Sequence, residues 1–223
     1  MNLKRLFNSY FHNPNYLYFL ISLILLILLP PFIYASAVGK LSFEIIYGTT
    51  LVLGSIHITR NYWEFSLSLL LSFTVFILFI LNINNFSLGV LSSILSTALF
   101  ILFFINLMKF MVSMKRVNAN SLFACISGYI LLGIVASMLF NLLSIYTRVL
   151  PFNIKGNNFY DLLYYSFTTI TSVGYGDIVP ITPLAKSITI LVSISGQLYL
   201  TFLVGIIIGK YLVHDQQFKI DKK

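Results

Sequence analysis

Long apolar runs separated by short polar stretches are the feature that most constrains how this chain can fold. The runs approach or exceed about 20 residues, the length that an α-helix needs to cross a bilayer. Of the 223 residues, 58% are hydrophobic and only 9% are charged. A soluble domain of this size needs more charge to cover its surface. The sequence therefore predicts an all-α integral membrane protein.

Six apolar segments have the character of transmembrane helices. They run approximately over residues 16–38, 43–59, 65–83, 88–112, 122–146 and 184–213. The second is the weakest, and the sixth is long enough to tilt or to extend past the bilayer. The moderately apolar stretch 159–171 is too short to span. It predicts a re-entrant helix, which membrane proteins tolerate where it is buried in protein or lines a water-filled cavity.

The positions of Lys and Arg predict the orientation. With the N-terminus in the cytoplasm, all but four of the 14 basic residues lie inside, as the positive-inside rule requires. The four outside are Lys40, Arg148, Lys155 and Lys186. We expect a multi-pass protein of the plasma membrane with both termini cytoplasmic. The net charge of +8 is dispersed between the apolar runs, so we expect membrane lipids and no nucleic acid as its surroundings.

The first residues allow two interpretations. Lys4-Arg5, the apolar run 17–29 and Ala35-Ser36-Ala37 together resemble a signal peptide with a small-residue cleavage site, although its charged region would be unusually long. In the interpretation that we favour, residues 1–15 form a cytoplasmic N-terminal segment that is able to lie as a short helix on the membrane surface.

One stretch, residues 168–177, contains the motif with chemical meaning. Its sequence reads Thr168-Thr169-Ile170-Thr171-Ser172-Val173-Gly174-Tyr175-Gly176-Asp177. The last five residues are expected by chance in a chain this long with a probability on the order of 10⁻⁴. The stretch resembles the selectivity filter of the tetrameric potassium channels, and the resemblance extends from about Leu122 to the C-terminus. It implies K⁺ as the transported ion and a homotetramer, because one loop cannot surround an ion.

The physical chemistry of K⁺ explains these residue types. The ion must exchange its water shell for oxygen ligands, which potassium channels supply as rings of backbone carbonyls. Consecutive carbonyls point at one axis only if alternate residues take unusual backbone angles, and Gly174 and Gly176 can do so without a Cβ penalty. The resemblance implies that the carbonyls of the K⁺ sites belong to Ser172, Val173, Gly174 and Tyr175. The Ser172 hydroxyl would complete the innermost site.

The resemblance also assigns residues that support the filter: Tyr164, Tyr165, Thr168, Thr171, Gly176 and Asp177. Many family members have two tryptophans at Tyr164-Tyr165, but tyrosine keeps a donor that can hold Asp177. Most family members have Thr at the position of Ser172. Some have Glu at the position of Thr168, so the carboxylate pair that this Glu would form with Asp177 is absent from this chain. Two other interpretations stay open: tyrosines that anchor at the membrane interface and an ordinary tight turn at the glycines.

Helix ends and glycines give further expectations. Asn157 or Asn158 would cap the re-entrant helix, with Asp161 near its positive end, and Thr182-Pro183 would begin the sixth segment. Gly196 is the candidate gating hinge, with close helix packing as the alternative. Gly205 and Gly209 form a G-x-x-x-G pair. His57 and Cys125 stand alone, so we expect no metal site, no disulfide within the chain and no cofactor.

The domain prediction follows from these assignments. Residues 16–118 form a four-helix transmembrane scaffold that resembles a voltage-sensor domain without sensor charges, because its fourth helix carries Lys109 alone. Residues 119–213 form the pore domain, and residues 214–223 form a short cytoplasmic tail. The leading interpretation is a passive K⁺-selective channel subunit and not an enzyme. Alternatives are a poorly selective cation channel, a carrier, a non-conducting regulatory subunit and, least supported, an intramembrane enzyme. The gating stimulus stays open.

Overall fold

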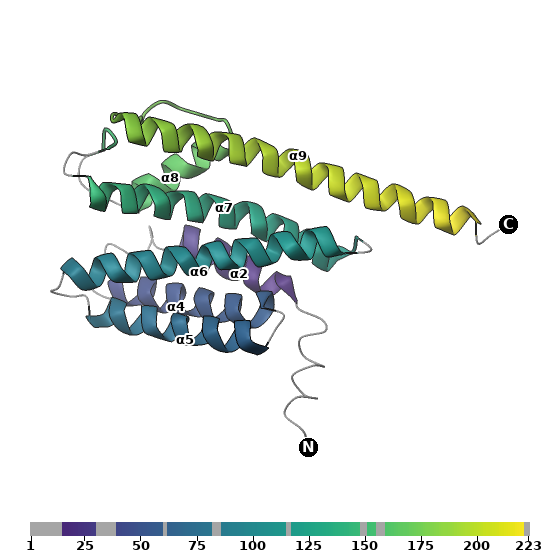
Figure 1. The fold of residues 1–223 in the computed structure, drawn as a ribbon, viewed down its shortest axis with the longest axis horizontal. Coiled ribbons are helices and arrows are strands. Elements are labelled where there is room, and N and C mark those ends of the chain that lie inside the picture. The colour runs from purple at the N-terminus through teal and green to yellow at the C-terminus, as the bar shows by residue number, and fades with distance from the viewer. Residues whose placement is uncertain are drawn as a thin grey trace, which may run out of the picture. The chain divides into compact units, whose positions relative to one another are not determined.

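The computed structural model describes residues 15–29, 39–59, 62–81, 86–114, 117–147, 151–154 and 159–220. These residues form helices (Figure 1): α2 (Tyr16–Leu28), α4 (Gly39–Ile58), α5 (Tyr62–Leu81), α6 (Phe86–Ser113), α7 (Ala119–Tyr146), α8 (Phe159–Ile170) and α9 (Pro183–Ile220). The prediction of an all-α chain is confirmed for this part of the molecule.

Three of these helices are long and apolar enough to cross a membrane. They are Ser87–Ser113 in α6, Ala119–Tyr146, which is α7, and Pro183–Leu203 in α9. Shorter apolar helices are Tyr16–Leu28, Ile45–Ile58 and Tyr62–Leu78. Six spans were predicted, and the first three stay a prediction. The expected surface helix and the signal-peptide alternative fall partly on residues 1–14 and 30–38, outside the described residues.

Local signals fix where two helices begin. The Asn15 side chain accepts a hydrogen bond from the Leu17 amide at 3.3 Å, which caps α2. The Thr182 hydroxyl likewise accepts from the Ala185 amide at 3.3 Å, and Pro183 is the first residue of α9, as predicted. Asp161 lies in the first turn of α8. Asn157 and Asn158, the predicted caps of α8, lie outside the described residues.

The chain divides into two compact units, residues 1–110 with 119–127, and residues 111–118 with 128–223. In the first unit, α2 packs on α4 and α4 on α5. Hydroxyl groups also join these helices: Ser55 and Ser72 hydroxyls are 3.2 Å apart, and the Thr50 hydroxyl donates to the Ser22 carbonyl at 3.4 Å. Such bonds stabilise helix pairs by only about 0.6 kcal/mol each. The scaffold and pore-domain boundaries stay a prediction.

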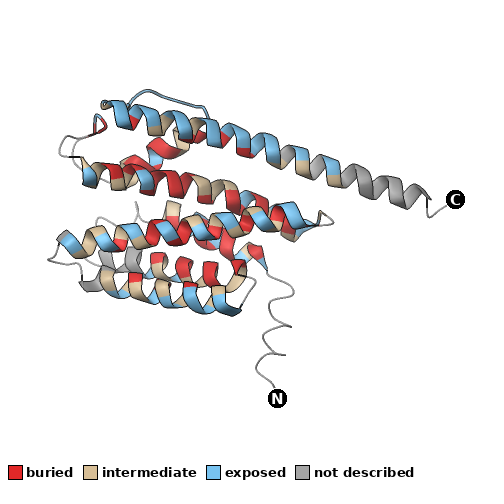
Figure 2. Cartoon of the chain, in the orientation of Figure 1, coloured by how far each residue is buried: buried red, intermediate tan, exposed pale blue. Residues whose placement is uncertain are grey.

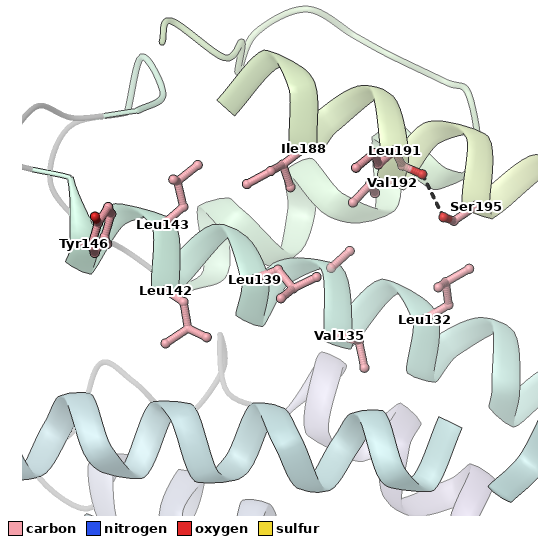
Figure 3. A pocket seen from close by; sticks show the side chains of 11 residues that line it. Leu132, Val135, Leu139, Leu142, Leu143, Tyr146, Ile188, Leu191, Val192 and Ser195 are labelled. Carbon is pink, nitrogen blue, oxygen red and sulfur yellow. Dashed lines mark hydrogen bonds between the residues drawn. The ribbon is translucent and has the colours of Figure 1, made fainter. Parts of the chain in front are cut away.

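In the second unit, α8 lies between α7 and α9, and its inner face is buried (Figure 2). The core there is largely aromatic. The rings of Phe140, Phe152 and Tyr165 contact one another with centroid distances of 5.1–5.2 Å. An apolar cavity of about 470 Å³ opens beside this core (Figure 3). It is lined by α7, from Leu132 to Tyr146, and by α9, from Ile188 to Ser195.

Further along α9, Lys210 reaches the C-terminal end of α6. Its ammonium group donates to the carbonyls of Met111, at 3.1 Å, Val112, at 3.0 Å, and Met114. A cation at these positions satisfies carbonyls that lack a partner within the helix and complements the negative end of the helix dipole. The contact ties α9 to the segment 111–114 of the same unit.

Candidate functional site

The site is built at the C-terminal end of α8, which hydrogen bonds hold against its two neighbours. The Ser166 hydroxyl, fully buried, donates to the Gly133 carbonyl of α7 at 2.8 Å. The Tyr165 hydroxyl and the Thr189 hydroxyl of α9 are 2.9 Å apart. The absence of a side chain at Gly133 allows α8 to approach α7 this closely, because a Cβ there would lie 2.6 Å from the Phe167 ring. Both bonds therefore fix the rotation of α8 about its axis.

The two adjacent tyrosines of α8 have different environments. Tyr165 is buried among Phe140 and Phe152, so it anchors the helix in the core. Tyr164 is 40% exposed, and its ring stacks on the Tyr175 ring with an interplanar angle of 2° and a centroid distance of 6.3 Å. Its hydroxyl donates a hydrogen bond to the Asp177 carboxylate, which raises the pKa of Tyr164 above its ordinary value. Tyr164 thus contacts both ends of the Tyr175–Asp177 segment.

The backbone that follows α8 alternates in handedness. Ser172, Gly174 and Gly176 have φ angles of 59°, 54° and 79°, while Val173 and Tyr175 do not have positive φ. The left-handed region suits glycine and is uncommon for other residues. Alternation of this kind is the geometry that lets successive carbonyls face one axis. The positive φ of Ser172 was missed from the sequence, although extending the glycine alternation by two residues points to it.

The last four carbonyls of α8 all have hydrogen-bond partners. Those of Phe167, Thr168 and Thr169 accept from the amides of Thr171, Gly174 and Ser172, each at 3.1 Å. The Ile170 carbonyl accepts from the Tyr129 hydroxyl of α7 at 3.2 Å. Carbonyls at a helix C-terminus otherwise depend on water. The chain after α8 is therefore folded directly over the helix end, which positions residues 172–175.

The side-chain hydroxyls of Thr168 and Thr171 donate hydrogen bonds to backbone carbonyls of α8. Thr168 Oγ1 donates to the Tyr165 carbonyl at 3.0 Å, and Thr171 Oγ1 donates to the Phe167 carbonyl at 2.7 Å. Thr171 and the residues 172–177 are exposed in the single chain. Among the residues that the structure describes, His, Cys, Asp and Glu form no group of three able to hold a metal ion.

Asn153, which the sequence reasoning missed, connects the segment before α8 to the segment after the motif. Its Nδ2 donates to the Asp177 carbonyl at 3.1 Å, and its Oδ1 accepts from the Val179 amide at 2.6 Å. The backbone adds two further bonds, from the Asn153 amide to the Val179 carbonyl at 3.2 Å and from the Ile181 amide to the Pro151 carbonyl at 2.8 Å. These contacts fix the chain directly after Asp177.

Replacement of Asn153 should therefore loosen the segment that follows Asp177. We expect Asn153→Ala to lower the free energy of unfolding by about 1–2 kcal/mol, because two hydrogen bonds are lost at an exposed position. Asn153→Asp keeps the acceptor for the Val179 amide and loses the donor to the Asp177 carbonyl. Its free energy of unfolding should therefore fall by about half as much as that of Asn153→Ala. Thermal unfolding of the purified protein measures both. Two variants that unfold like the wild type would show that the bonds do not stabilise the segment.

The inner side of the motif contacts α9. Gln197 Nε2 donates to the Ser172 hydroxyl at 2.7 Å and lies 3.4 Å from the Ile170 carbonyl. Gly196, the predicted hinge, is buried where α9 crosses the end of α8. A Cβ on Gly196 would lie 2.5 Å from the Ile170 carbonyl oxygen. Close packing is therefore present at Gly196, and its role as a hinge stays a prediction.

The pair Gly205 and Gly209 behaves differently. A Cβ at either position would meet nothing within 4 Å in the single chain. These glycines therefore make no close helix contact within the described part of the chain, and the predicted packing role of the pair would require a second molecule.

Comparison with known proteins finds similarity to ion channels. Residues 124–212 match the family described as "Ion channel". A voltage-gated potassium channel of Aeropyrum pernix is 48% identical over 46 residues, which are 21% of this chain and 16% of that protein. Two-pore potassium channel 4 of Arabidopsis thaliana is 35% identical over 66 residues, which are 30% of this chain and 23% of that protein. No solved structure matches.

Residues 124–212 are thus similar to ion channels, and parts of the chain are similar to two potassium channels. The resemblance inferred from residues 168–177 is confirmed. The matched segments cover less than a quarter of either relative's length. The match to ion channels and the three helices of spanning length both support a location in a membrane. The matched family is one of ion channels and not of enzymes.

Sequence reasoning also missed Tyr129 and Gln197, two side chains that reach the end of α8. A signal was present for Gln197, because an amide inside the apolar run 184–213 is unusual and polar residues inside membrane segments tend to be functional. Tyr129 carried no such signal, because tyrosine is common in apolar segments near the membrane surface.

Proposed function

We propose that the chain is one subunit of a K⁺-selective channel that conducts K⁺ passively across the plasma membrane. The observation that carries the proposal is the alternating backbone at Ser172, Gly174 and Gly176, whose φ angles are all positive. In this proposal the carbonyls of Ser172, Val173, Gly174 and Tyr175 replace the water shell of the ion. Tyr164, Tyr165, Thr168, Thr171, Gly176 and Asp177 support the filter. K⁺ is the transported ion, and no cofactor takes part.

Ion flux from liposomes that contain only this protein tests the proposal. We expect a K⁺ gradient to drive flux and an equal Na⁺ gradient to drive at least about a hundredfold less, because carbonyl rings favour K⁺. Equal K⁺ and Na⁺ flux would indicate the poorly selective cation channel. Absence of any flux would favour the non-conducting regulatory subunit.

Assembly is the next prediction. Each chain contributes one filter strand, so a closed ring of carbonyls needs several copies, and we propose a homotetramer with cyclic symmetry. Much of α9 is uncovered in the single chain, including Leu191, Leu198 and Phe202, which fits burial against other copies. The purified protein in mild detergent should have the mass of a tetramer by light scattering. A conducting monomer or dimer would refute this architecture.

Voltage dependence should be weak, although one relative is named a voltage-gated channel. Lys109 is exposed on α6 near its C-terminal end. If it crossed a third of a 100 mV drop, it would contribute under about 1 kcal/mol per subunit, or about 3 kcal/mol for four. We expect the open probability to change little between negative and positive potentials, and Lys109→Gln to leave it nearly unchanged. A steep activation curve that flattens in Lys109→Gln would show that Lys109 is a sensor charge.

A further inference from the structure

Gln197 occupies an unusual position on α9. It lies in the apolar part of the helix, Pro183–Leu203, directly after the buried Gly196. The close approach of Gly196 to Ile170 brings the Gln197 side chain to the end of α8. From there its Nε2 donates to the Ser172 hydroxyl at 2.7 Å. Both Gln197 and Ser172 are exposed in the single chain, so they lie on a face that the chain itself leaves open.

The contact with Ser172 is the stronger of the two that Gln197 makes. The other acceptor, the Ile170 carbonyl, is 3.4 Å away, at the limit for a hydrogen bond. That carbonyl also accepts from the Tyr129 hydroxyl at 3.2 Å, so it keeps a partner without Gln197. A role in capping the C-terminal end of α8 therefore does not explain why the Gln197 side-chain amide lies here. The Ser172 hydroxyl is the atom that depends on it.

Ser172 needs an external partner to hold its hydroxyl in one orientation. Its φ of 59° lies in the left-handed region, where a β-branched residue would be strained. Serine is not β-branched, and it lacks the γ-methyl group that restricts χ1 in threonine. A serine hydroxyl is free to rotate, and it has one donor and two acceptor lone pairs. Left alone, it could direct its hydrogen toward a bound cation.

We propose that Gln197 is a positioning residue that determines how the Ser172 hydroxyl presents itself to K⁺ at the innermost ion site. The Nε2–H bond occupies one lone pair of the hydroxyl oxygen. The second lone pair stays available to a cation, and the hydroxyl hydrogen is directed elsewhere. Gln197 thus acts on the ion only through Ser172. This inference rests on the proposed function, because it assumes that residues 172–175 bind K⁺.

A double-mutant cycle tests the inference. Gln197→Met keeps the length of the side chain and removes the donor, while Ser172→Ala removes the hydroxyl. We expect Gln197→Met to lower the K⁺ affinity by at least about fivefold, because one hydrogen bond of ordinary strength gives that factor and every subunit of the proposed homotetramer loses one. We also expect it to lower the K⁺ over Na⁺ flux ratio. In the Ser172→Ala background, the same change should have less than about a twofold effect. Titration calorimetry with K⁺ measures affinity, and liposome flux measures the ratio.

Thr201→Ala is the matched control. Thr201 lies one turn further along α9, is exposed, and donates only to the Gln197 carbonyl of its own helix, at 2.9 Å. This variant should bind K⁺ like the wild type. Gln197→Leu repeats the test with a second side chain that cannot donate. Thermal unfolding in Na⁺ alone measures what the hydrogen bond itself contributes to stability. The extra stabilisation that K⁺ adds should be smaller in the Gln197 variants than in the wild type, because a positioning role acts on the bound ion.

Three outcomes would overturn the inference. One is an equal loss of K⁺ affinity from Gln197→Met with and without Ser172. Another is a lower melting temperature in Na⁺ with unchanged K⁺ affinity, which would show a structural role. The third is a wild-type protein that does not bind K⁺, which would overturn the proposed function as well. A wild-type protein that binds K⁺ without conducting it contradicts the proposed function alone, and calorimetry then still decides the role of Gln197.

Discussion

Alanine in place of Gly174 is expected to abolish K⁺-selective flux. Gly174 has a φ of 54°, and a Cβ there would meet nothing within 4 Å in the single chain. The cost is therefore conformational, about 1 kcal/mol or more for a left-handed alanine. Across four subunits this becomes roughly 4 kcal/mol, which corresponds to a factor of about 10³ in the population of the conducting filter. Liposome flux under a K⁺ gradient measures the loss.

Gly205→Ala is the matched control for this experiment. A Cβ on Gly205 also meets nothing within 4 Å in the single chain, but Gly205 lies within α9 and does not have a positive φ. Alanine is favoured over glycine in a helix, so Gly205→Ala should conduct K⁺ like the wild type. Normal K⁺ over Na⁺ preference in Gly174→Ala would mean that the ion is selected elsewhere in the protein.

The helices could largely be predicted from the sequence, because apolar runs and capping residues are local signals. A short helix was predicted over residues 159–171 and is observed as Phe159–Ile170, while its re-entrant position in the membrane stays a prediction. The end of α9 was harder to predict. Hydropathy placed it near Val213, but the helix continues to Ile220. Hydropathy marks where a membrane could end, and neither glycine nor proline follows Val213 to end the helix itself.

The motif could be recognised because its glycines encode unusual backbone angles, but its surroundings could not. Asn153 precedes α8 in the sequence but contacts Asp177 and Val179, which follow it. Gln197 contacts Ser172 from α9. Such pairs depend on tertiary packing, which a single sequence does not specify. Gly196 shows the same limit, since a glycine in a membrane helix indicates either a hinge or a close contact. Only the structure reveals its approach to Ile170.

Gly196→Ala is the second change with a large expected effect. The added Cβ would lie 2.5 Å from the Ile170 carbonyl oxygen and 2.8 Å from the Ile170 Cα, and Ile170 is fully buried. Overpacking of this kind typically costs about 1–3 kcal/mol. The displaced carbonyl belongs to the helix end over which residues 172–175, the proposed filter, fold. We therefore expect a lower melting temperature together with a loss of K⁺ selectivity in flux measurements.

The chemical nature of the contact allows close packing and a hinge to be separated. At Gly133, the three atoms nearest to an added Cβ all belong to the ring of Phe167, so Phe167→Leu should partly rescue Gly133→Ala. At Gly196, two of the three nearest atoms belong to the backbone of Ile170, so Ile170→Ala should not rescue Gly196→Ala. If Gly196 acts only as a hinge, Gly196→Ala should change the open probability and leave the melting temperature unaltered. That result would contradict the packing argument. An unaltered melting temperature would mean that the new methyl group displaces no backbone atom of α8, so α9 would bend at Gly196 without contacting α8 there.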